Sequence, residues 1–156
     1  MQSQFSGRDR SAVDWALLIA RIAIGCVFMV HGAQLLFGAF SGPGLWAFVQ
    51  AMGPLGYLIS IGEFFGGLGL VAGFLSRFSA ASLILIMIGA IFLVHARFGF
   101  FMNWQGKQAG EGYEYHIIAI GILLPILIAG AGRFAVGRYL PLPKSKDRER
   151  PIAVLE

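Results

Sequence analysis

The sequence predicts an all-α protein: a four-transmembrane-helix bundle whose N and C termini are both cytoplasmic. Three observations favour this fold class. The 156 residues are 57% hydrophobic and only 13% charged, with a mean hydropathy of +0.74, whereas soluble domains are about a quarter charged. The apolar residues fall into four long blocks, and the basic residues gather in alternate segments between the blocks. Little of the chain is left for a soluble domain.

Each apolar block is long enough to cross a bilayer as a helix, which takes about 20 residues. The four blocks cover residues 15–37, 55–75, 78–98 and 115–131. The chain then divides into a cytoplasmic N-terminal tail (1–14), a four-helix membrane domain (15–137) and a basic cytoplasmic tail (138–156). The last of these is charged and interrupted by proline, a composition typical of disorder.

The first block follows Arg8 and Arg10, as the apolar segment of a cleaved signal peptide would. However, it contains Arg21 and ends in His31 and Gly32, with no small-residue cleavage site. We therefore expect an uncleaved helix.

Basic residues predict the orientation, because Lys and Arg are retained on the cytoplasmic side. Arg8 and Arg10 precede the first block, Arg77 lies between the second and third, and six Lys or Arg residues follow the fourth, whereas the other loops carry only Arg97 and Lys107. Segments 38–54 and 99–113 should therefore face outward. The formal net charge of +4 is then a topology signal that also favours contact with anionic lipid, and it does not indicate nucleic-acid binding.

A single carboxylate, Glu63, interrupts the second block. It should lie about 13 Å from the outer end of its helix, where a charge costs about 3 kcal/mol on insertion scales. Helical spacing places Glu63 on one face with Gly56, Ser60 and Gly67. Small residues allow another helix to approach, so Glu63 should point into the bundle.

Arg21 of the first block is the expected partner of Glu63. It shares a face with Gly25 and Gly32, and its predicted axial offset from Glu63, roughly 7 Å, is within reach of a long side chain. Two interpretations remain open. The pair is either an ion pair that fixes helix packing or a ligand-contacting site, because intramembrane ionisable residues are functional candidates.

A second group of polar residues should lie at the outward rim: His31, His95, Arg97, Glu111 and Glu114. If the last helix already begins at Glu111, the two acids share one face, and His116, about 160° from Glu114, should point away. Two acids at a helix N-terminus also satisfy the helix dipole without further function. Aromatic side chains near the same rim form either an interfacial belt or a site for a flat ring such as a quinone head: Phe98, Phe100, Phe101, Trp104, Tyr113 and Tyr115.

Metal chemistry finds little support in the sequence. Di-iron bundles repeat a Glu-x-x-His motif on two helices, and the segment from Glu111 to His116 has no such repeat. The lone Cys26 excludes an intrachain disulfide or a Cys-x-x-Cys pair, and we interpret it as an apolar helix residue. Haem with His31 and His95 as axial ligands stays open, but no metal site is predicted.

The order of several short segments resembles the DoxX family of small four-helix membrane proteins. The segments are RIAIG, HGAQLLFGAFSGPG, GEFFGGLGLVAGFLSR, HARFGFFMNWQGKQAGEGYEYH and GAGRF, within residues 15–137. The resemblance implies membrane redox chemistry in the plasma (inner) membrane of a prokaryote, since relatives include a quinone-linked oxidoreductase subunit. Two positions depart from the family pattern: Leu35 replaces a frequent lysine, and Gly137 replaces a frequent acid.

Two functional hypotheses follow. In the first, the protein is a subunit of a membrane redox complex that binds quinone or a similar lipid-soluble carrier, with His31, His95 and Glu114 exchanging protons. The ligand contacts would then come from Arg21, Glu63, Arg97, Phe101, Trp104 and Glu111. Because no electron-carrier motif is present, a partner redox protein, or a homo-oligomer, is needed. In the second, the bundle is a structural or assembly factor, or a small-solute conduit, without redox chemistry.

Overall fold

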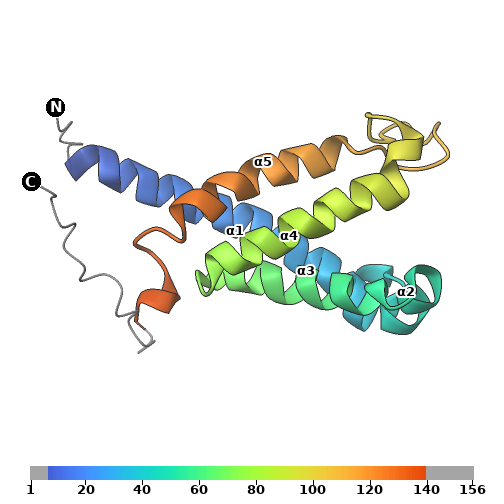
Figure 1. The fold of residues 1–156 in the computed structure, drawn as a ribbon, viewed down its shortest axis with the longest axis horizontal. Coiled ribbons are helices and arrows are strands. Elements are labelled where there is room, and N and C mark those ends of the chain that lie inside the picture. Colours follow the sequence, from blue (N-terminus) through green and yellow to red (C-terminus); the bar gives the residue numbers. More distant parts are fainter. Residues whose placement is uncertain (1–6, 140–156) are drawn as a thin grey trace, which may run out of the picture.

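The computed structural model describes residues 7–139, and within that range it contains helices and turns but no strand (Figure 1). The five α-helices are α1 (Gly7–Phe37), α2 (Gly44–Met52), α3 (Leu55–Ala72), α4 (Ser76–Ala90) and α5 (Glu114–Ala129). Short helical turns occupy Ala39–Ser41, Ile91–His95, Ala96–Phe98 and Val136–Arg138. All but the first two residues of the predicted C-terminal tail, 138–156, lie outside the described residues.

The all-α prediction is confirmed, and the predicted blocks correspond to α1, α3, α4 with its two following turns, and α5. α1 begins at Gly7, about two turns before the predicted start at residue 15. Within residues 7–139, three helical segments are long and apolar enough to cross a membrane: Arg10–Phe37, Leu55–Ala72 and Ser76–Phe98. α5 is a shorter apolar helix of 16 residues, about 24 Å long.

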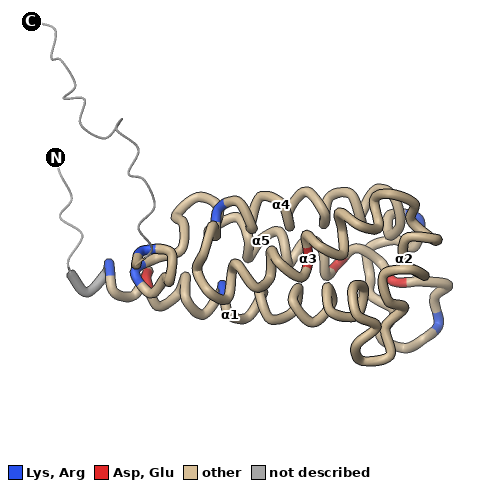
Figure 2. The backbone as a smooth tube through the Cα atoms, turned by 90° about the horizontal axis from the view of Figure 1, so that it is seen from below, with Lys and Arg blue, Asp and Glu red and all other residues tan. Residues whose placement is uncertain are grey.

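The long helices run alternately up and down between two ends of the bundle (Figure 1). We call the end where α1 begins and the described chain finishes the terminal end. The opposite end, which carries α2 and residues 99–113, is the loop end. The most extensive helix contact is between α1 and α3, followed by α4 with α5 and then α3 with α4. Figure 2 shows basic positions gathered at the terminal end.

Glycines allow α1 and α3 to touch backbone to backbone. A Cβ atom added at Gly25 would lie 2.8 Å from the carbonyl oxygen of Gly67, and one added at Gly67 would lie 2.6 Å from the carbonyl oxygen of Gly25. Nearer the loop end, Gly32 lies against the backbone of Phe64. No larger residue fits at these distances, so the small-residue face predicted from the sequence is the contact between these two helices.

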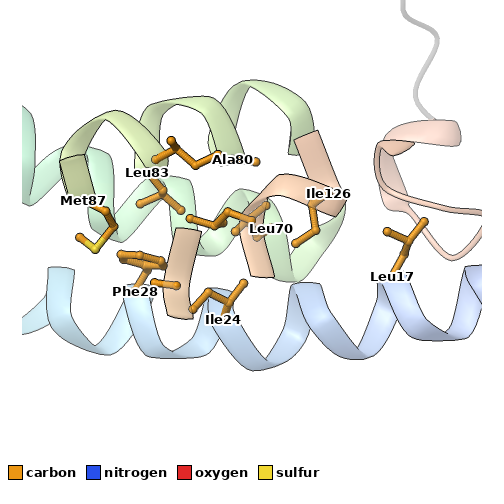
Figure 3. Close-up of a cluster of buried hydrophobic side chains, with 11 residues drawn as sticks. Leu17, Ile24, Phe28, Leu70, Ala80, Leu83, Met87 and Ile126 are labelled. Carbon is orange, nitrogen blue, oxygen red and sulfur yellow. The ribbon is translucent and has the colours of Figure 1, made fainter. Parts of the chain in front are cut away.

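The apolar core lies between α1, α3, α4 and α5, where Phe28, Leu70, Met87 and Ile126 meet (Figure 3). Many large apolar side chains point outward instead, including Phe92, which is 78% exposed. A helix that is apolar on all sides is typical of a membrane span. The outer surface is therefore suited to lipid.

Arg21 is fully buried, but it does not pair with Glu63. Its Nη1 donates to the Leu70 carbonyl oxygen and its Nη2 to the Phe134 carbonyl oxygen, both at 2.8 Å. The predicted ion pair is wrong: among residues 7–139, no salt bridge joins the two side chains. The Leu70 carbonyl lies in the last turn of α3, where carbonyl oxygens carry partial negative charge, so the arginine turns toward the terminal end.

α2 was not predicted, because its nine residues lie within the segment 38–54 that we expected only to face outward. It is bounded by Gly44, with φ of 73°, and Gly53, with φ of 64°. These left-handed conformations favour glycine and turn the chain sharply at both ends. α2 packs against α1 and α3 and covers the loop end of the bundle.

Candidate functional site

A cavity of about 520 Å³ opens among the helices at the loop end. Its size lies within the range of small-molecule sites, about 300–1,000 Å³. Most of its wall is apolar, with contributions from Phe28, Leu35, Phe48 and Met87. Six polar residues also line it: His31, Glu63, His95, Glu111, Tyr115 and His116. Apolar walls with a few convergent polar groups are typical of a ligand site.

Glu63 lies halfway along α3 and points into the bundle, as predicted. It is 8% exposed, and its helix face includes the buried residues Gly56, Ser60 and Gly67. The Ser60 hydroxyl is engaged, because it donates to the Gly56 carbonyl oxygen at 2.7 Å. By contrast, the buried Oε2 atom of Glu63 finds no hydrogen-bond partner within the described part of the chain.

His95 reaches the cavity through a local change of helix type. α4 continues as a π-helical turn over Ile91–His95, and such turns are frequent at functional sites. The His95 Nδ1 atom lies 2.7 Å from the Glu111 carbonyl oxygen. A carbonyl oxygen only accepts, so Nδ1 carries the proton in this bond and the neutral ring keeps Nε2 as an acceptor.

His116 lies inside the bundle, and the prediction that it points away is wrong. It is 6% exposed, and its ring centroid lies 4.2 Å from that of His95. Its helix face continues through Ala119, Leu123 and Ile126, all fully buried. The prediction failed because it took Glu114 as the inward residue. The residues that follow His116 are apolar on all sides of α5, so their spacing in the sequence did not mark its inward face.

Tyr115 completes the polar lining. Its ring stacks on the His31 ring with centroids 6.3 Å apart. Its buried hydroxyl, the Oε2 atom of Glu63 and the Nδ1 atom of His116 share one property: none has a hydrogen-bond partner among residues 7–139. Buried polar atoms are nearly always paired, so three unpaired atoms in one cavity mark a place where a polar ligand or water would be accommodated.

The two acids before and at the start of α5 hold the loop that borders the cavity. α5 begins at Glu114, so Glu111 lies in the loop and the predicted shared helix face is absent. Glu111 Oε2 accepts from the Asn103 backbone N–H at 2.6 Å, and Glu114 Oε2 accepts from the Met102 N–H at 3.2 Å. Met102 itself lines the cavity. Both acids therefore position the loop.

Five of the nine predicted site residues lie outside the cavity lining: Arg21, Arg97, Phe101, Trp104 and Glu114. Arg97 lies over the Phe98 ring, 4.6 Å from its centroid. Phe101 and Trp104 are 68% and 80% exposed and border a separate hollow of about 320 Å³ in the loop. Within residues 7–139, no group of three or more His, Cys, Asp or Glu side chains is placed to hold a metal ion.

Comparison with known proteins places the chain in a family. The DoxX family model matches residues 16–96. The Inner membrane protein YqjF of Escherichia coli (strain K12) is 30% identical over 131 residues, which cover 81% of this chain and 93% of the relative. No solved structure matches the chain significantly. Together with its apolar helices, these similarities identify the protein as a multi-pass inner membrane protein that belongs to the DoxX family.

Proposed function

We propose that the loop-end cavity binds a quinone or a similar flat, lipid-soluble carrier, and that the protein serves as a subunit of a membrane redox complex. The observation that carries the proposal is the clustering of three unpaired polar atoms, from Glu63, Tyr115 and His116, in one apolar cavity. A bound quinone would supply the capacity to take up two electrons and two protons. The apolar walls suit its ring and tail, and the polar atoms suit its oxygens.

The histidines have the chemistry for proton exchange. His95 is oriented by its bond to the Glu111 carbonyl oxygen, which leaves Nε2 as the nitrogen that can take up a proton. His31 lies on another wall, against Tyr115. Glu114 accepts from the Met102 backbone N–H and so holds the loop. The sequence predicted that Glu114 also exchanges protons, but in this proposal only the cavity histidines do so.

Electrons have to come from a partner. The chain has one cysteine and therefore no thiolate cluster of its own. A partner redox protein, or a second copy within a larger complex, would supply them. Arg77, Arg133 and Arg138 lie at the terminal end, so the distribution of basic residues favours a cytoplasmic terminal end and an outward-facing cavity.

Tyr115→Phe tests the proposal with little risk to the fold. The substitution removes a buried hydroxyl that has no partner in the described structure, so thermal stability should be unchanged or slightly higher. The loss of one hydrogen bond to a ligand should weaken binding about three- to tenfold. Binding of a short-chain ubiquinone to the detergent-purified protein, together with the quinone that co-purifies, gives the measurement.

Tyr113→Phe is the matched control. Tyr113 packs edge-on against Phe100 with centroids 5.6 Å apart and does not line the cavity. Its substitution should leave quinone binding unchanged. If wild type binds no quinone, or if both variants bind as wild type does, the redox hypothesis fails and a structural or assembly role, or a solute conduit, is favoured.

A further inference from the structure

A second cavity, of about 990 Å³, opens at the terminal end. It lies between the start of α1, the α3–α4 turn and the segment that follows α5. Among the described residues, three arginines line it, Arg10, Arg77 and Arg138, together with one acid, Asp14. Asp14 is already engaged, because its Oδ1 accepts from the Arg133 backbone N–H at 2.8 Å. The cavity therefore has an excess of positive charge.

The floor of this cavity is the N-terminus of α4. Its first turn carries no acidic residue, although the free N–H groups and the dipole of a helix N-terminus attract anions. Ser76, the first residue of α4, is 5% exposed and lines the cavity. Its buried hydroxyl oxygen has no hydrogen-bond partner among the described residues. The helix end and this hydroxyl both have unused capacity to bind an anion.

Arg77 joins the cavity to α5. Its Nη2 donates to the Ile128 carbonyl oxygen at 2.9 Å, near the end of that helix. A guanidinium has five N–H donors, and this is the one hydrogen bond that the Arg77 side chain makes within residues 7–139. The remaining donors suit a phosphate group, which arginine binds through two parallel hydrogen bonds.

An apolar groove of about 620 Å³ continues from the basic cavity along α3 and α4. The two share Leu75 and Phe78 as lining residues. Small residues of α3 and α4 form much of its floor: Gly62, Gly66, Gly69, Ala72, Ser79 and Ser82. From Ala72 to Ile61 the groove follows about 17 Å of α3, on the outer surface of the bundle.

We propose that these two features form one site for an anionic phospholipid. The phosphate would lie among Arg10, Arg77 and Arg138, and one acyl chain would lie in the α3–α4 groove. Basic pockets between transmembrane helices bind anionic headgroups in this way. A free phosphate would use only the cavity. A second copy of the chain in the same membrane orientation would bring its own three arginines close to these, and the resulting charge repulsion disfavours a dimer that forms through the groove.

Native mass spectrometry of the full chain in detergent tests the site. Wild type should retain one phosphatidylglycerol and bind it more tightly than phosphatidylcholine with the same acyl chains. The double variant Arg10→Gln, Arg138→Gln should weaken this binding about 30-fold, from about 1 kcal/mol for each arginine. Arg133→Gln is the matched charge control, since Arg133 lies at the same end but does not line the cavity, and its effect should be less than threefold.

The groove is tested by Ser82→Phe, which fills it with an aromatic ring. Phosphatidylglycerol retention should fall at least tenfold, while Gly121→Phe, which projects into open space from α5, should leave it unchanged. Equal binding of the two lipids would overturn the proposal. So would equal loss in the arginine variants and Arg133→Gln, full retention in Ser82→Phe, or displacement of the lipid by millimolar inorganic phosphate. A dimer that Ser82→Phe disrupts without any bound lipid would also overturn it.

Discussion

His95 and His116 lie with their ring centroids 4.2 Å apart, although one ends the π-helical turn after α4 and the other lies in the first turn of α5. Their contact closes one wall of the loop-end cavity. The two rings differ in their hydrogen bonding. His95 Nδ1 is bound to the Glu111 carbonyl oxygen, whereas His116 Nδ1 has no partner among the described residues.

His116→Phe should weaken binding of a short-chain ubiquinone about three- to tenfold, because a ring of similar shape remains while one ligand hydrogen bond is lost. Thermal stability in detergent should change little. Trp104→Phe is the control, since Trp104 is 80% exposed and lies outside the cavity. Unchanged affinity in the His116 variant would remove this histidine from the proposed site.

Arg21→Leu should lower the free energy of unfolding by about 2–4 kcal/mol. Two hydrogen bonds to a charged group contribute about 1.5–3 kcal/mol each, and part of that is offset because the desolvation cost of the buried charge also disappears. A denaturant titration in mixed micelles measures the change. In a double-mutant cycle, Arg21→Leu and Glu63→Gln should be additive within about 0.5 kcal/mol. A coupling energy well above 0.5 kcal/mol would indicate a direct interaction between Arg21 and Glu63 and would contradict the structure.

Gly25→Ala should destabilise the bundle by about 1–3 kcal/mol, because the added methyl group would lie 2.8 Å from the Gly67 carbonyl oxygen and force α1 away from α3. Gly121→Ala is the matched control in α5, where a Cβ atom meets nothing within 4 Å. That variant should be stabilised by about 0.5–1 kcal/mol. Thermal unfolding of both variants in one detergent checks the contrast, and equal destabilisation would argue against close packing at Gly25.

Glu114→Ala should loosen the loop at residues 99–113 without unfolding the helices. The Met102 N–H loses its acceptor, so its hydrogen exchange should accelerate about tenfold, as expected for the loss of about 1.4 kcal/mol. Gln105→Ala, in an exposed position of the same loop, should leave this exchange unchanged. Met102 exchange as slow as in wild type would show that the loop is held by other contacts.

The proposed orientation predicts the accessibility of two positions in a Cys26→Ser background. A cysteine at Gln105, at the loop end, should react with an impermeant thiol reagent applied to intact cells. A cysteine at Val136, which is 54% exposed at the terminal end, should react only after the cells are opened. The reverse pattern would invert the topology and place the arginine-lined cavity on the outer side.

The sequence by itself determined the four apolar helices α1, α3, α4 and α5 and the burial of Glu63. Long apolar blocks and glycine spacing are local properties, and in a membrane the backbone has to satisfy its hydrogen bonds within each helix. The order and approximate positions of these apolar helices therefore followed from composition, although α1 begins at Gly7 and not at residue 15. The inward face of α3, marked by Gly56, Ser60 and Gly67, followed in the same way.

The tertiary structure decided which groups the polar side chains contact. Arg21 turned to the carbonyl oxygens of Leu70, in the last turn of α3, and of Phe134, in the segment that follows α5; carbonyl oxygens at a helix C-terminus carry partial negative charge. His116 entered the cavity because the rotation of α5 is fixed by the packing of Ala119, Leu123 and Ile126. The π-helical turn at Ile91–His95 changed the direction of His95. Helix rotation and side-chain reach depend on contacts between segments distant in sequence, so periodicity within one segment does not determine them.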